Sequence, residues 1–580
     1  MASLDEKRHT LAHLLAASIL ERYPHAKATI GPAVENGFYY DFDFSGGEAP
    51  KETDLPLIQE AMEQLLPSWD SMGGTEVSEK DARDRFKDNP YKLELIDGIV
   101  AAGEPITLYT AGSFTDLCRG GHSEQPAHDL KPGSFTLERI AGAYWRGDEK
   151  NPMLTRIYGL AFDTKEELAA YREQQEEAKK RDHRKLGVEL DLFTFSPLVG
   201  SGLPLYTPRG TMMREALAGF SEELQRAHGF EKVWIPHITK TDLYKTSGHW
   251  DKFGDELFLV KSQESSDEFA LKPMNCPHHT QIYVSKPRSY RDLPLRYMET
   301  TTCYRDEKTG ELSGLTRVRS LTQDDAHVFC RPDQIEAEFA AIMGMIKTLY
   351  GALGMQFKAR LSFSDPAKPE KYIGDPALWK DAEATIEKIA KALELDYVVA
   401  PGEAAFYGPK IDIMVVDALG REWQCATQQL DFVQPERFAL EYTDTDGTKK
   451  RPVMIHKALL GTIDRFMGVY IEHTAGNFPA WLSPEQVRVL PVSDKQEAYA
   501  REVLASLKAA GIRAQVADGD SLGKRIRAAK QEKLPYVLVI GDKEIESRTV
   551  SVESRDRGPE GAEALDTFVA RVAKEIQERS

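Results

Sequence analysis

The chain has few cysteines and no long apolar segment. Its five cysteines are spread over 580 residues without a Cys-x-x-Cys pair, which is not the pattern of a disulfide framework. No run approaches the roughly 18 consecutive apolar residues expected of a membrane helix, and the first residues lack the apolar stretch of a signal peptide. These absences predict a cytoplasmic protein that does not span a membrane.

Positive charge is also scarce. Seventy-four lysines and arginines stand against 92 aspartates and glutamates, for a formal net charge of −18. This excludes a generally basic nucleic-acid coat protein but permits a local basic surface, since steering depends on where charges lie. Residues 188–483 contain neither the Gly-x-Gly-x-x-Gly dinucleotide fingerprint nor the Gly-x-x-x-x-Gly-Lys-[Ser/Thr] phosphate loop. These two kinds of nucleotide site are therefore not predicted.

The length and the changes of composition predict several domains. We expect an α+β domain over residues 1–165, a charged and solvated linker helix over 166–187, a mixed α/β block over 188–483 and a small α/β domain over 484–580. Within the first domain, apolar periodicity predicts helices over 10–23 and 55–66, and an aromatic strand over 38–44. Strands alternate with helices in the last domain, which indicates an α/β fold.

Two chemical features lie close together in the central block. Arg305 and Glu307 precede a polar turn that contains glycine, and Arg317 follows it, which predicts a strand, a loop and a second strand. Arginine forks suit phosphate oxygens because they are planar and bidentate. Cys276 and His327 are both zinc-type ligands, although a buried cysteine is more often a small packing residue.

Three segments of this block resemble the signature motifs of class II aminoacyl-tRNA synthetases. A helix over 212–228 followed by a strand that ends at Pro236 resembles motif 1, the dimer element. Arg305-x-Glu307 with its loop resembles motif 2, and the segment 461–465 resembles motif 3. The resemblance implies an antiparallel-sheet catalytic domain between an N-terminal α+β editing domain and a C-terminal α/β anticodon-binding domain.

Further segments narrow the resemblance to the threonyl-tRNA synthetase family. They are Met274-Asn275-Cys276-Pro277, Gln323-Asp324-Asp325-Ala326-His327 and Met454-Ile455-His456-Lys457. The family implies a threonine–tRNA ligase that uses L-threonine, ATP and tRNA(Thr), acts as a homodimer and holds one zinc ion per chain through Cys276, His327 and His456. A pocket that relies on shape separates threonine from valine only about a hundredfold. A metal with an open position can instead bind the threonine amine and hydroxyl.

The resemblance also implies roles for other residues. Arg305 would hold the α-phosphate while the threonine carboxylate attacks it, and Arg465 and Arg317 would hold the γ end of a bent ATP with its Mg²⁺, beside Glu307. Positions expected around the substrates are Met274, Gln323, Asp325, Tyr407, Gln424, Thr427 and Gln429. The chain departs from the family at Leu321, where a phenylalanine usually stacks on adenine opposite Arg465.

A second cluster lies in the first domain. His9 and His13 have helical i, i+4 spacing, and Cys118 and His122 repeat that spacing. Packing histidines or a plain zinc site are alternative interpretations. The cluster resembles the editing site shared by threonyl- and alanyl-tRNA synthetases, which implies hydrolysis of seryl-tRNA(Thr). The family has further site residues at the positions of Tyr40, Lys92 and Asp116, and metal binding stays open.

The resemblance is less complete at the two ends of the chain. Bacterial family members usually begin with a small ubiquitin-like domain, which we expect to be missing here by truncation or by lineage. In the last domain, Arg527 and Glu544 match tRNA-binding positions, whereas Gly519 and Glu553 stand where the family has asparagine and arginine.

Two other functions compete with the ligase. One is a catalytically inactive relative that binds tRNA or mRNA; Arg305, Arg465 and the three zinc-type ligands argue against it, because a binding module has no use for them. The other is a zinc hydrolase, which would not need the arginines of motif 2, and the chain has no His-Glu-x-x-His motif.

Overall fold

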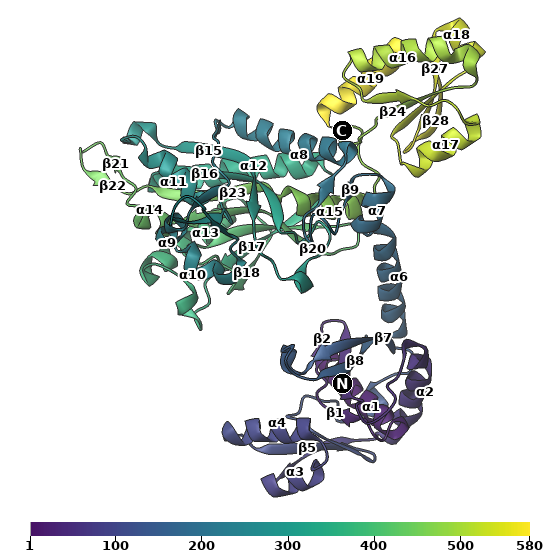
Figure 1. Cartoon of the computed structure of the whole chain (residues 1–580), viewed down its shortest axis with the longest axis vertical. Helices are drawn as coiled ribbons and strands as arrows, with labels where there is room; N and C mark the ends of the chain where they lie inside the picture. The colour runs from purple at the N-terminus through teal and green to yellow at the C-terminus, as the bar shows by residue number, and fades with distance from the viewer. Residues whose placement is uncertain (1, 580) are drawn as a thin grey trace. The chain divides into compact units, whose positions relative to one another are not determined.

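The computed structural model describes residues 2–579 and separates into two compact units (Figure 1), one that ends at Glu177 and one that begins at Ala178. No helix among the described residues is long and apolar enough to cross a membrane. The four-domain division expected from composition stays a prediction.

The first unit is built on two antiparallel sheets with helices beside them. Its larger sheet has the order β1-β3-β8-β7, with β2 paired to β3, and the smaller one has the order β4-β5-β6. The elements of the larger sheet and its helices are β1 (Lys27–Ala28), β2 (Ala33–Val34), β3 (Gly37–Asp43), β7 (Phe135–Tyr144), β8 (Met153–Ala161), α1 (Leu4–Arg22) and α2 (Leu55–Leu65). Those of the smaller sheet are β4 (Met72–Val77), β5 (Ile106–Ala111), β6 (Phe114–Leu117), α3 (Glu79–Arg85) and α4 (Pro90–Ala101).

Helix α1 begins six residues before the predicted start. Ser3 accepts a hydrogen bond from the Glu6 amide, and the Glu6 carboxylate accepts one from the Ser3 amide, which forms a capping box. The first turns are charged, so apolar periodicity becomes visible only from Thr10 onward. The predictions of the aromatic strand and of α2 are confirmed to within one residue.

The single linker helix predicted over 166–187 is wrong, because two helices occupy this region. Helix α6 covers Lys165–Arg181 and α7 covers His183–Glu189. Between them Asp182 has φ −49° and ψ 118°, which is not helical, and its side chain accepts a hydrogen bond from the Arg184 amide. Asp182 is therefore the N-cap of a new helix.

An eight-stranded sheet forms the centre of the second unit. Its order is β11-β15-β16-β23-β20-β19-β17-β18, antiparallel throughout except for the parallel pairs at its two edges. The strands are β11 (Glu231–Lys232), β15 (Leu295–Tyr304), β16 (Ser320–Cys330), β17 (Gln356–Phe363), β18 (Tyr397–Pro401), β19 (Lys410–Val416), β20 (Glu422–Asp431) and β23 (Val453–Thr462). The expected antiparallel catalytic sheet is confirmed. The predicted motif 1 strand is shorter, because only Glu231 and Lys232 pair with β15.

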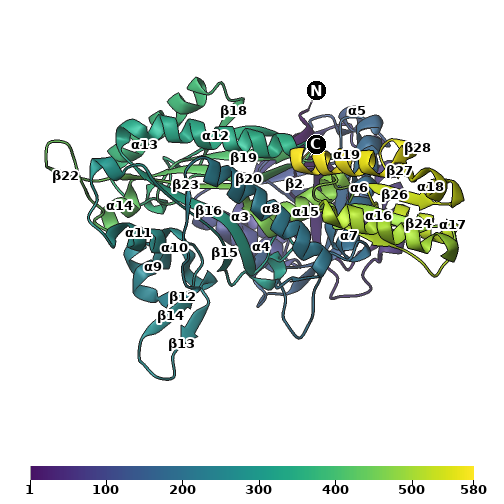
Figure 2. The same ribbon diagram turned by 90° about the horizontal axis from the view of Figure 1, so that it is seen from above.

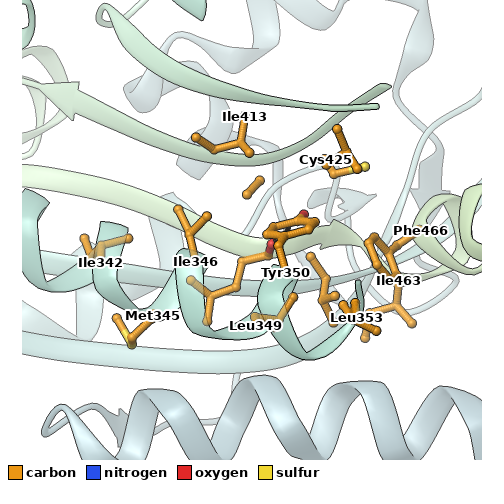
Figure 3. Close-up of a cluster of buried hydrophobic side chains, with 14 of the residues drawn as sticks. Ile342, Met345, Ile346, Leu349, Tyr350, Leu353, Ile413, Cys425, Ile463 and Phe466 are labelled. Carbon is orange, nitrogen blue, oxygen red and sulfur yellow. Dashed lines mark hydrogen bonds between the residues drawn. The ribbon is translucent and has the colours of Figure 1, made fainter. Parts of the chain in front are cut away.

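One face of this sheet carries the apolar core. Helices α8 (Pro208–Ala227), α12 (Ile335–Ala352) and α15 (Ile463–Thr474) pack on it. Figure 3 shows Ile342, Ile346 and Tyr350 of α12 on the side of the helix that faces the strands, near Ile413 and Cys425. Alternate residues of β16, namely Ala326, Val328 and Cys330, belong to the same core.

The other residues of β16 point to the opposite face, because successive side chains of a strand alternate. There Phe329 packs in a second cluster with Cys276 and Tyr283 of α11 (Cys276–Val284). Helix α11 contacts α9 (Thr241–Ser247), which contacts α10 (His249–Phe253) and the strands β12 (Ile238–Lys240) and β14 (Glu268–Leu271). Figure 2 shows these elements grouped together with β13 (Leu259–Lys261).

The C-terminal part of this unit has a five-stranded sheet of order β25-β24-β26-β27-β28. Its elements are β24 (Val487–Pro491), α16 (Glu497–Ala509), β25 (Ala514–Val516), α17 (Leu522–Gln531), β26 (Tyr536–Ile540), α18 (Asp542–Ser547), β27 (Thr549–Ser554), β28 (Gly558–Ala564) and α19 (Leu565–Glu578). The α/β prediction is confirmed for the elements up to β26. The antiparallel pair β27–β28 was not predicted. The sequence of β28 favours a turn rather than a strand, because it contains Gly558, Pro559 and Gly561.

Ile346→Ala should destabilise the second unit. The side chain is fully buried between α12 and the sheet, so its truncation should lower the free energy of unfolding by about 2–5 kcal/mol. Urea unfolding followed by circular dichroism measures the shift, and Lys347→Ala on the exposed side of α12 is the matched control. An unchanged midpoint for Ile346→Ala would contradict this packing.

Candidate active sites

Strand register brings the predicted substrate and metal residues together. Gln323, Asp325 and His327 are alternate residues of β16 and therefore share one face. His327 is paired with His456 of β23, which is paired in turn with Gln429 of β20. Three neighbouring strands thus present polar side chains at one place on the sheet.

Cys276, His327 and His456 form a buried group with metal-ligand geometry. Their ligand atoms all lie within 4.8 Å of one another, and each residue is at most 5% exposed. Zinc bound tetrahedrally at its usual nitrogen and sulfur distances holds its ligand atoms roughly 3–4 Å apart. The donor set of one thiolate and two imidazoles and the spacing both fit a zinc ion.

The contacts around the two histidines favour the same conclusion. His456 Nε2 lies 2.8 Å from Asp431 Oδ2, and His327 Nδ1 lies 2.8 Å from His279 Nδ1. The remaining nitrogens, His327 Nε2 and His456 Nδ1, face each other at 3.1 Å. Burial lowers the pKa of His327 well below its ordinary value, so the ring is neutral as a ligand requires. A carboxylate behind a ligating histidine is the usual outer support of a metal site.

Two further buried histidines, which were not predicted, lie beside this group. His249 places Nε2 3.6 Å from Cys276 Sγ, and burial lowers its pKa to about 3. His279 stands three residues after Cys276 in α11 and touches His327. Residues at positions i and i+3 lie on the same face of a helix, so the spacing of Cys276 and His279 indicates from sequence that His279 lies on the side of Cys276. The position of His249 has no such signal.

The predicted substrate residues Met274, Asp325, Tyr407 and Gln429 surround the cysteine–histidine group. Asp325 accepts a hydrogen bond of 2.9 Å from Asn275, and its Oδ1 lies 3.7 Å from His327 Nε2. The Tyr407 ring lies 5.0 Å from the His456 ring, and Gln429 donates to the Gly408 carbonyl at 3.0 Å. Met274 is in contact with Arg305 through a distance of 3.1 Å between its sulfur and the guanidinium.

Gln424 and Thr427 are held by a buried carboxylate that was not predicted. Asp412 of β19 accepts hydrogen bonds from Gln424 at 2.8 Å and from Thr427 at 3.0 Å. Lys410 and Arg360 pair with its other oxygen at 2.8 and 3.2 Å. An aspartate inside the apolar strand β19 is a signal for such a polar centre, because a buried charge needs partners.

A cavity of about 450 Å³ lies beside Arg305, within the range of roughly 300–1,000 Å³ that small-molecule sites occupy. Its walls include Arg305, Glu307, Arg317, Leu321, Trp423 and Arg465. The structure therefore brings together all four predicted ATP residues, Arg305, Glu307, Arg317 and Arg465.

The arginines of this cavity have the charge and the free or fixed donors that suit an anion. The Nε atoms of Arg305 and Arg465 are buried without a hydrogen-bond partner among the described residues. Arg317 is held by Glu307 at 2.7 Å and by Glu311 at 2.5 Å. Gly461 at the turn into α15 has φ +77°, and a Cβ there would lie 2.3 Å from the Cys425 carbonyl oxygen. Only glycine allows this turn, which positions Arg465.

Trp423, which was not predicted, gives the cavity an aromatic wall. Its ring centroid lies 6.0 Å from the Arg465 guanidinium carbon, and its indole nitrogen donates to Asp417 at 2.9 Å. Leu321 also lines the cavity and is buried. Trp423 directly precedes Gln424, a predicted substrate residue, and this position in the sequence indicates that Trp423 could line the site.

The first unit brings its seven predicted editing residues into one cluster. Cys118 Sγ lies 3.5 Å from His9 Nε2 and 3.4 Å from His122 Nε2. Asp116 lies 3.1 Å from His13 Nδ1, accepts a 2.5 Å hydrogen bond from Tyr40 and forms an ion pair with Lys92. The four sulfur and imidazole ligands lie within 4.8 Å of one another, so this group also has metal-ligand geometry.

Charges are strongly coupled in this cluster. Burial disfavours the thiolate of Cys118, but contacts with His122, His13 and His9 outweigh it and lower the pKa to about 3. Burial likewise opposes a charge on His13, yet Asp116 and Cys118 raise its pKa to about 9. At neutral pH the cluster therefore contains a thiolate beside an imidazolium, a state that suits a reactive centre.

The two predicted tRNA-binding residues lie on two different helices of the C-terminal part. Arg527 is exposed on α17. Glu544 of α18 accepts a 2.8 Å hydrogen bond from the Gly541 amide, which caps that helix. Glu553 pairs with Lys530 at 2.7 Å, so it neutralises one of the basic side chains of α17.

Two families match parts of the chain. Residues 258–474 match the tRNA synthetase class II core domain (G, H, P, S and T), and residues 486–575 match an anticodon binding domain. The threonine–tRNA ligase of Rubrobacter xylanophilus is 48% identical over 576 residues, 99% of this chain and 89% of that protein. The one from Thermosynechococcus vestitus is 48% identical and covers 98% of this chain and 94% of its own length.

Solved structures of aminoacyl-tRNA synthetases are also similar to this chain. The RNA binding domain of threonyl-tRNA synthetase from Cryptosporidium parvum Iowa II is 38% identical, with a TM-score of 0.64 over 68% of this chain and 98% of that one. Prolyl-tRNA synthetase from Cryptosporidium parvum, with proline and AMP, is 19% identical with a TM-score of 0.53 over 68% and 74%. That second likeness concerns the fold alone.

Cys118 should react with iodoacetamide at a rate that hardly changes between pH 5 and 9 in metal-free protein. Its thiol is already deprotonated above a pKa of about 3, whereas the thiolate fraction of an ordinary cysteine rises about tenfold per unit until roughly pH 8.5. Mass spectrometry of the alkylated peptide gives the rate. His13→Ala removes a cationic neighbour and should restore pH dependence. A tenfold rise per unit in the unmodified chain would contradict the thiolate.

Proposed function

The chain belongs to the threonine–tRNA ligase family, and on this premise we propose that it joins L-threonine to tRNA(Thr) at the expense of ATP. The observation that carries the proposal is that Arg305 connects the arginine-lined cavity to Met274, which packs in the same cluster as Cys276. Arg305 touches Met274 on one side and lines the cavity on the other. An amino acid and a nucleotide can therefore meet at its guanidinium.

The adenylation step depends on position and charge. Arg305 holds the α-phosphate while the threonine carboxylate attacks the phosphorus, and pyrophosphate leaves on the opposite side. Arg465 and Arg317 bind the γ end of ATP, whose phosphates also carry Mg²⁺, and Trp423 packs against the base. No covalent enzyme intermediate is needed, because alignment and neutralisation of the phosphate charge supply the rate.

Threonine is selected beside the cysteine–histidine group. We propose that Cys276, His327 and His456 hold one zinc ion, which when bound offers a Lewis-acidic position that suits the threonine amine and hydroxyl. Asp325, held by Asn275, accepts from the substrate amine, and Tyr407 with Gln429 closes the pocket around the side chain. Gln323 lies on the same face of β16, and Gln424 and Thr427 are oriented by Asp412.

The first unit is proposed to hydrolyse seryl-tRNA(Thr). Serine carries the same amine and hydroxyl as threonine, and one missing methyl group contributes only about 1–3 kcal/mol to discrimination. Lys92 and Tyr40 hold Asp116, and Asp116 pairs with the charged His13. Together with His9, Cys118 and His122, His13 can orient a water molecule and stabilise an oxyanion. Editing with or without a bound metal is compatible with this cluster.

The remaining proposals concern the tRNA, a second copy of the chain and the cellular compartment. Arg527 and Glu544 are proposed to meet the anticodon of the tRNA, and the exposed side of α17 supports this for Arg527. A homodimer is proposed through motif 1, where Trp234 beside the edge strand β11 is 76% exposed. Tryptophan is enriched in the cores of protein interfaces. The proposed compartment is the cytoplasm.

Replacing Cys276 with alanine tests the main proposal. Purified protein should contain one zinc per chain, and Cys276→Ala should lose both the zinc and at least about 99% of threonine-dependent ATP–pyrophosphate exchange, because two imidazoles alone hold zinc weakly. Cys330→Ala, a buried cysteine on the core face of β16, is the matched control. Full exchange by a zinc-free Cys276→Ala enzyme would refute the assignment.

The double variant His13→Ala, Cys118→Ala tests the editing site. Activation of threonine and serine should be unchanged, because neither residue belongs to the second unit, while seryl-tRNA(Thr) should accumulate. The wild type should deacylate seryl-tRNA(Thr) quickly and threonyl-tRNA(Thr) slowly, and the exposed His128→Ala should behave like the wild type. If the double variant clears seryl-tRNA(Thr) at the wild-type rate, the cluster is structural.

A further inference from the structure

His183 joins α7 to the loop between β15 and β16. Its Nε2 accepts a 3.0 Å hydrogen bond from the Leu315 amide, and its Nδ1 lies 2.6 Å from Glu472 Oε1 of α15. An amide can only donate, so Nε2 is unprotonated and Nδ1 carries the proton that is donated to Glu472. All three residues are buried, with 4% exposure for His183, 0% for Leu315 and 7% for Glu472.

The surroundings of His183 are shaped for this contact. Gly314 has φ +49°, and a Cβ there would lie 2.2 Å from His183 Nε2. Gly468 of α15 lets the loop approach from the other side, where a Cβ would lie 3.3 Å from Leu315 and 3.5 Å from the His183 ring. Two glycines thus leave space for the imidazole and for the loop it holds.

This contact fixes a turn that carries a residue of the ATP cavity. The Ser313 amide donates to the Arg317 carbonyl and the Arg317 amide donates to the Ser313 carbonyl, each at 3.2 Å, so Leu315 lies at the tip of a tight turn. Arg317 then donates to Glu307 at 2.7 Å. Anchoring Leu315 therefore places the guanidinium of Arg317.

The same network reaches Trp423, another residue that lines the cavity. Glu472 pairs with Arg421 at 2.5 Å, Arg421 pairs with Asp417 at 2.6 Å, and Asp417 accepts from the Trp423 indole at 2.9 Å. His183 and Glu472, together with Asp182, could also approach a metal, but Arg421 and Arg184 occupy the two carboxylates. The arrangement is that of a positioning network.

We propose that His183 is a positioning residue for ATP, which holds the Arg317 wall of the cavity by accepting the Leu315 amide. This inference rests on the proposed function, since it assumes that the cavity binds ATP. Loss of the acceptor leaves a buried amide without a partner and frees the turn, so affinity for ATP falls. Asp325 and His327 of the threonine pocket lie eight and ten residues beyond Arg317, within the hydrogen-bonded part of β16, so we expect the pocket to keep its geometry.

Two substitutions separate the two nitrogens of the ring. His183→Asn retains a donor near the position of Nδ1 and loses the acceptor, whereas His183→Gln can place an amide oxygen near the position of Nε2. His183→Asn should raise the ATP Kd, measured by equilibrium dialysis, and the KM for ATP in pyrophosphate exchange roughly tenfold. His183→Gln should recover most of this loss, and the KM for threonine should not change. The exposed His128→Asn is the matched control.

Gly314→Ala provides a second route if His183→Asn fails to fold. Its Cβ would displace the acceptor from the loop side, so it should weaken ATP binding selectively. The proposal is wrong if folded His183→Asn or Gly314→Ala binds ATP like the wild type, if glutamine rescues no better than asparagine, or if ATP and threonine are weakened equally. A wild type that binds ATP without threonine-dependent exchange would instead refute the proposed function, and the dialysis comparison would still decide the role of His183.

Discussion

The register between β16, β23 and β20 is the constraint on which the second unit depends. It pairs His327 with His456 and His456 with Gln429. A slip by one residue would move every site residue of a strand to the core face, because side chains alternate. Asp324 holds the register from the core side: its carboxylate accepts hydrogen bonds from Ser221 and from the amides of Leu459, Leu460 and Gly461. The same aspartate therefore supports both the histidine pair and the turn that leads to Arg465.

The apolar core and the polar residues of the candidate site have different roles in this unit. Residues of α12 and alternate residues of β16 form an apolar core. Among the described residues, several buried polar atoms lack protein partners, including Nε of Arg305, which follows β15, and Nε of Arg465 in the first turn of α15. Arginine donors that line a cavity and lack protein partners suit an anion, and a phosphate group is such a ligand. The apolar core thus supplies the stability of the unit, and a bound substrate would supply the missing hydrogen-bond partners of the arginines.

Two cysteine–histidine groups of similar composition differ in their surroundings. Cys276 packs against apolar and aromatic side chains with the neutral His249 3.6 Å away, and burial raises its thiol pKa well above the ordinary value. Cys118 lies within hydrogen-bonding distance of two imidazoles and next to the cationic His13, which keep its pKa at about 3. The first environment favours a thiolate only when a cation is bound, whereas the second favours a free thiolate. This difference agrees with a binding role for one group and a hydrolytic role for the other.

Much of the candidate site could be predicted from sequence because motifs keep fixed spacing within a segment. Arg305, Glu307 and Arg317 belong to one strand–loop–strand unit, and their meeting around one cavity follows from local structure. The rest depends on contacts between distant segments: His183 and Leu315 are 132 residues apart, and no local pattern announces their hydrogen bond. Asp412 and Trp423 gain their roles from the β19–β20 pairing in the same way. The break at Asp182 was missed because the charged residues on both sides of it favour a helix.

Recognition of threonine is proposed to take place at the group Cys276, His327 and His456, so substrate discrimination is its most direct test. ATP–pyrophosphate exchange should be compared for threonine, serine and valine with the same zinc-containing preparation. Threonine and serine, which share the amine and the hydroxyl, should both support exchange, and valine should support almost none. Exchange with valine within about a hundredfold of that with threonine, the level that shape alone can reach, would contradict this account.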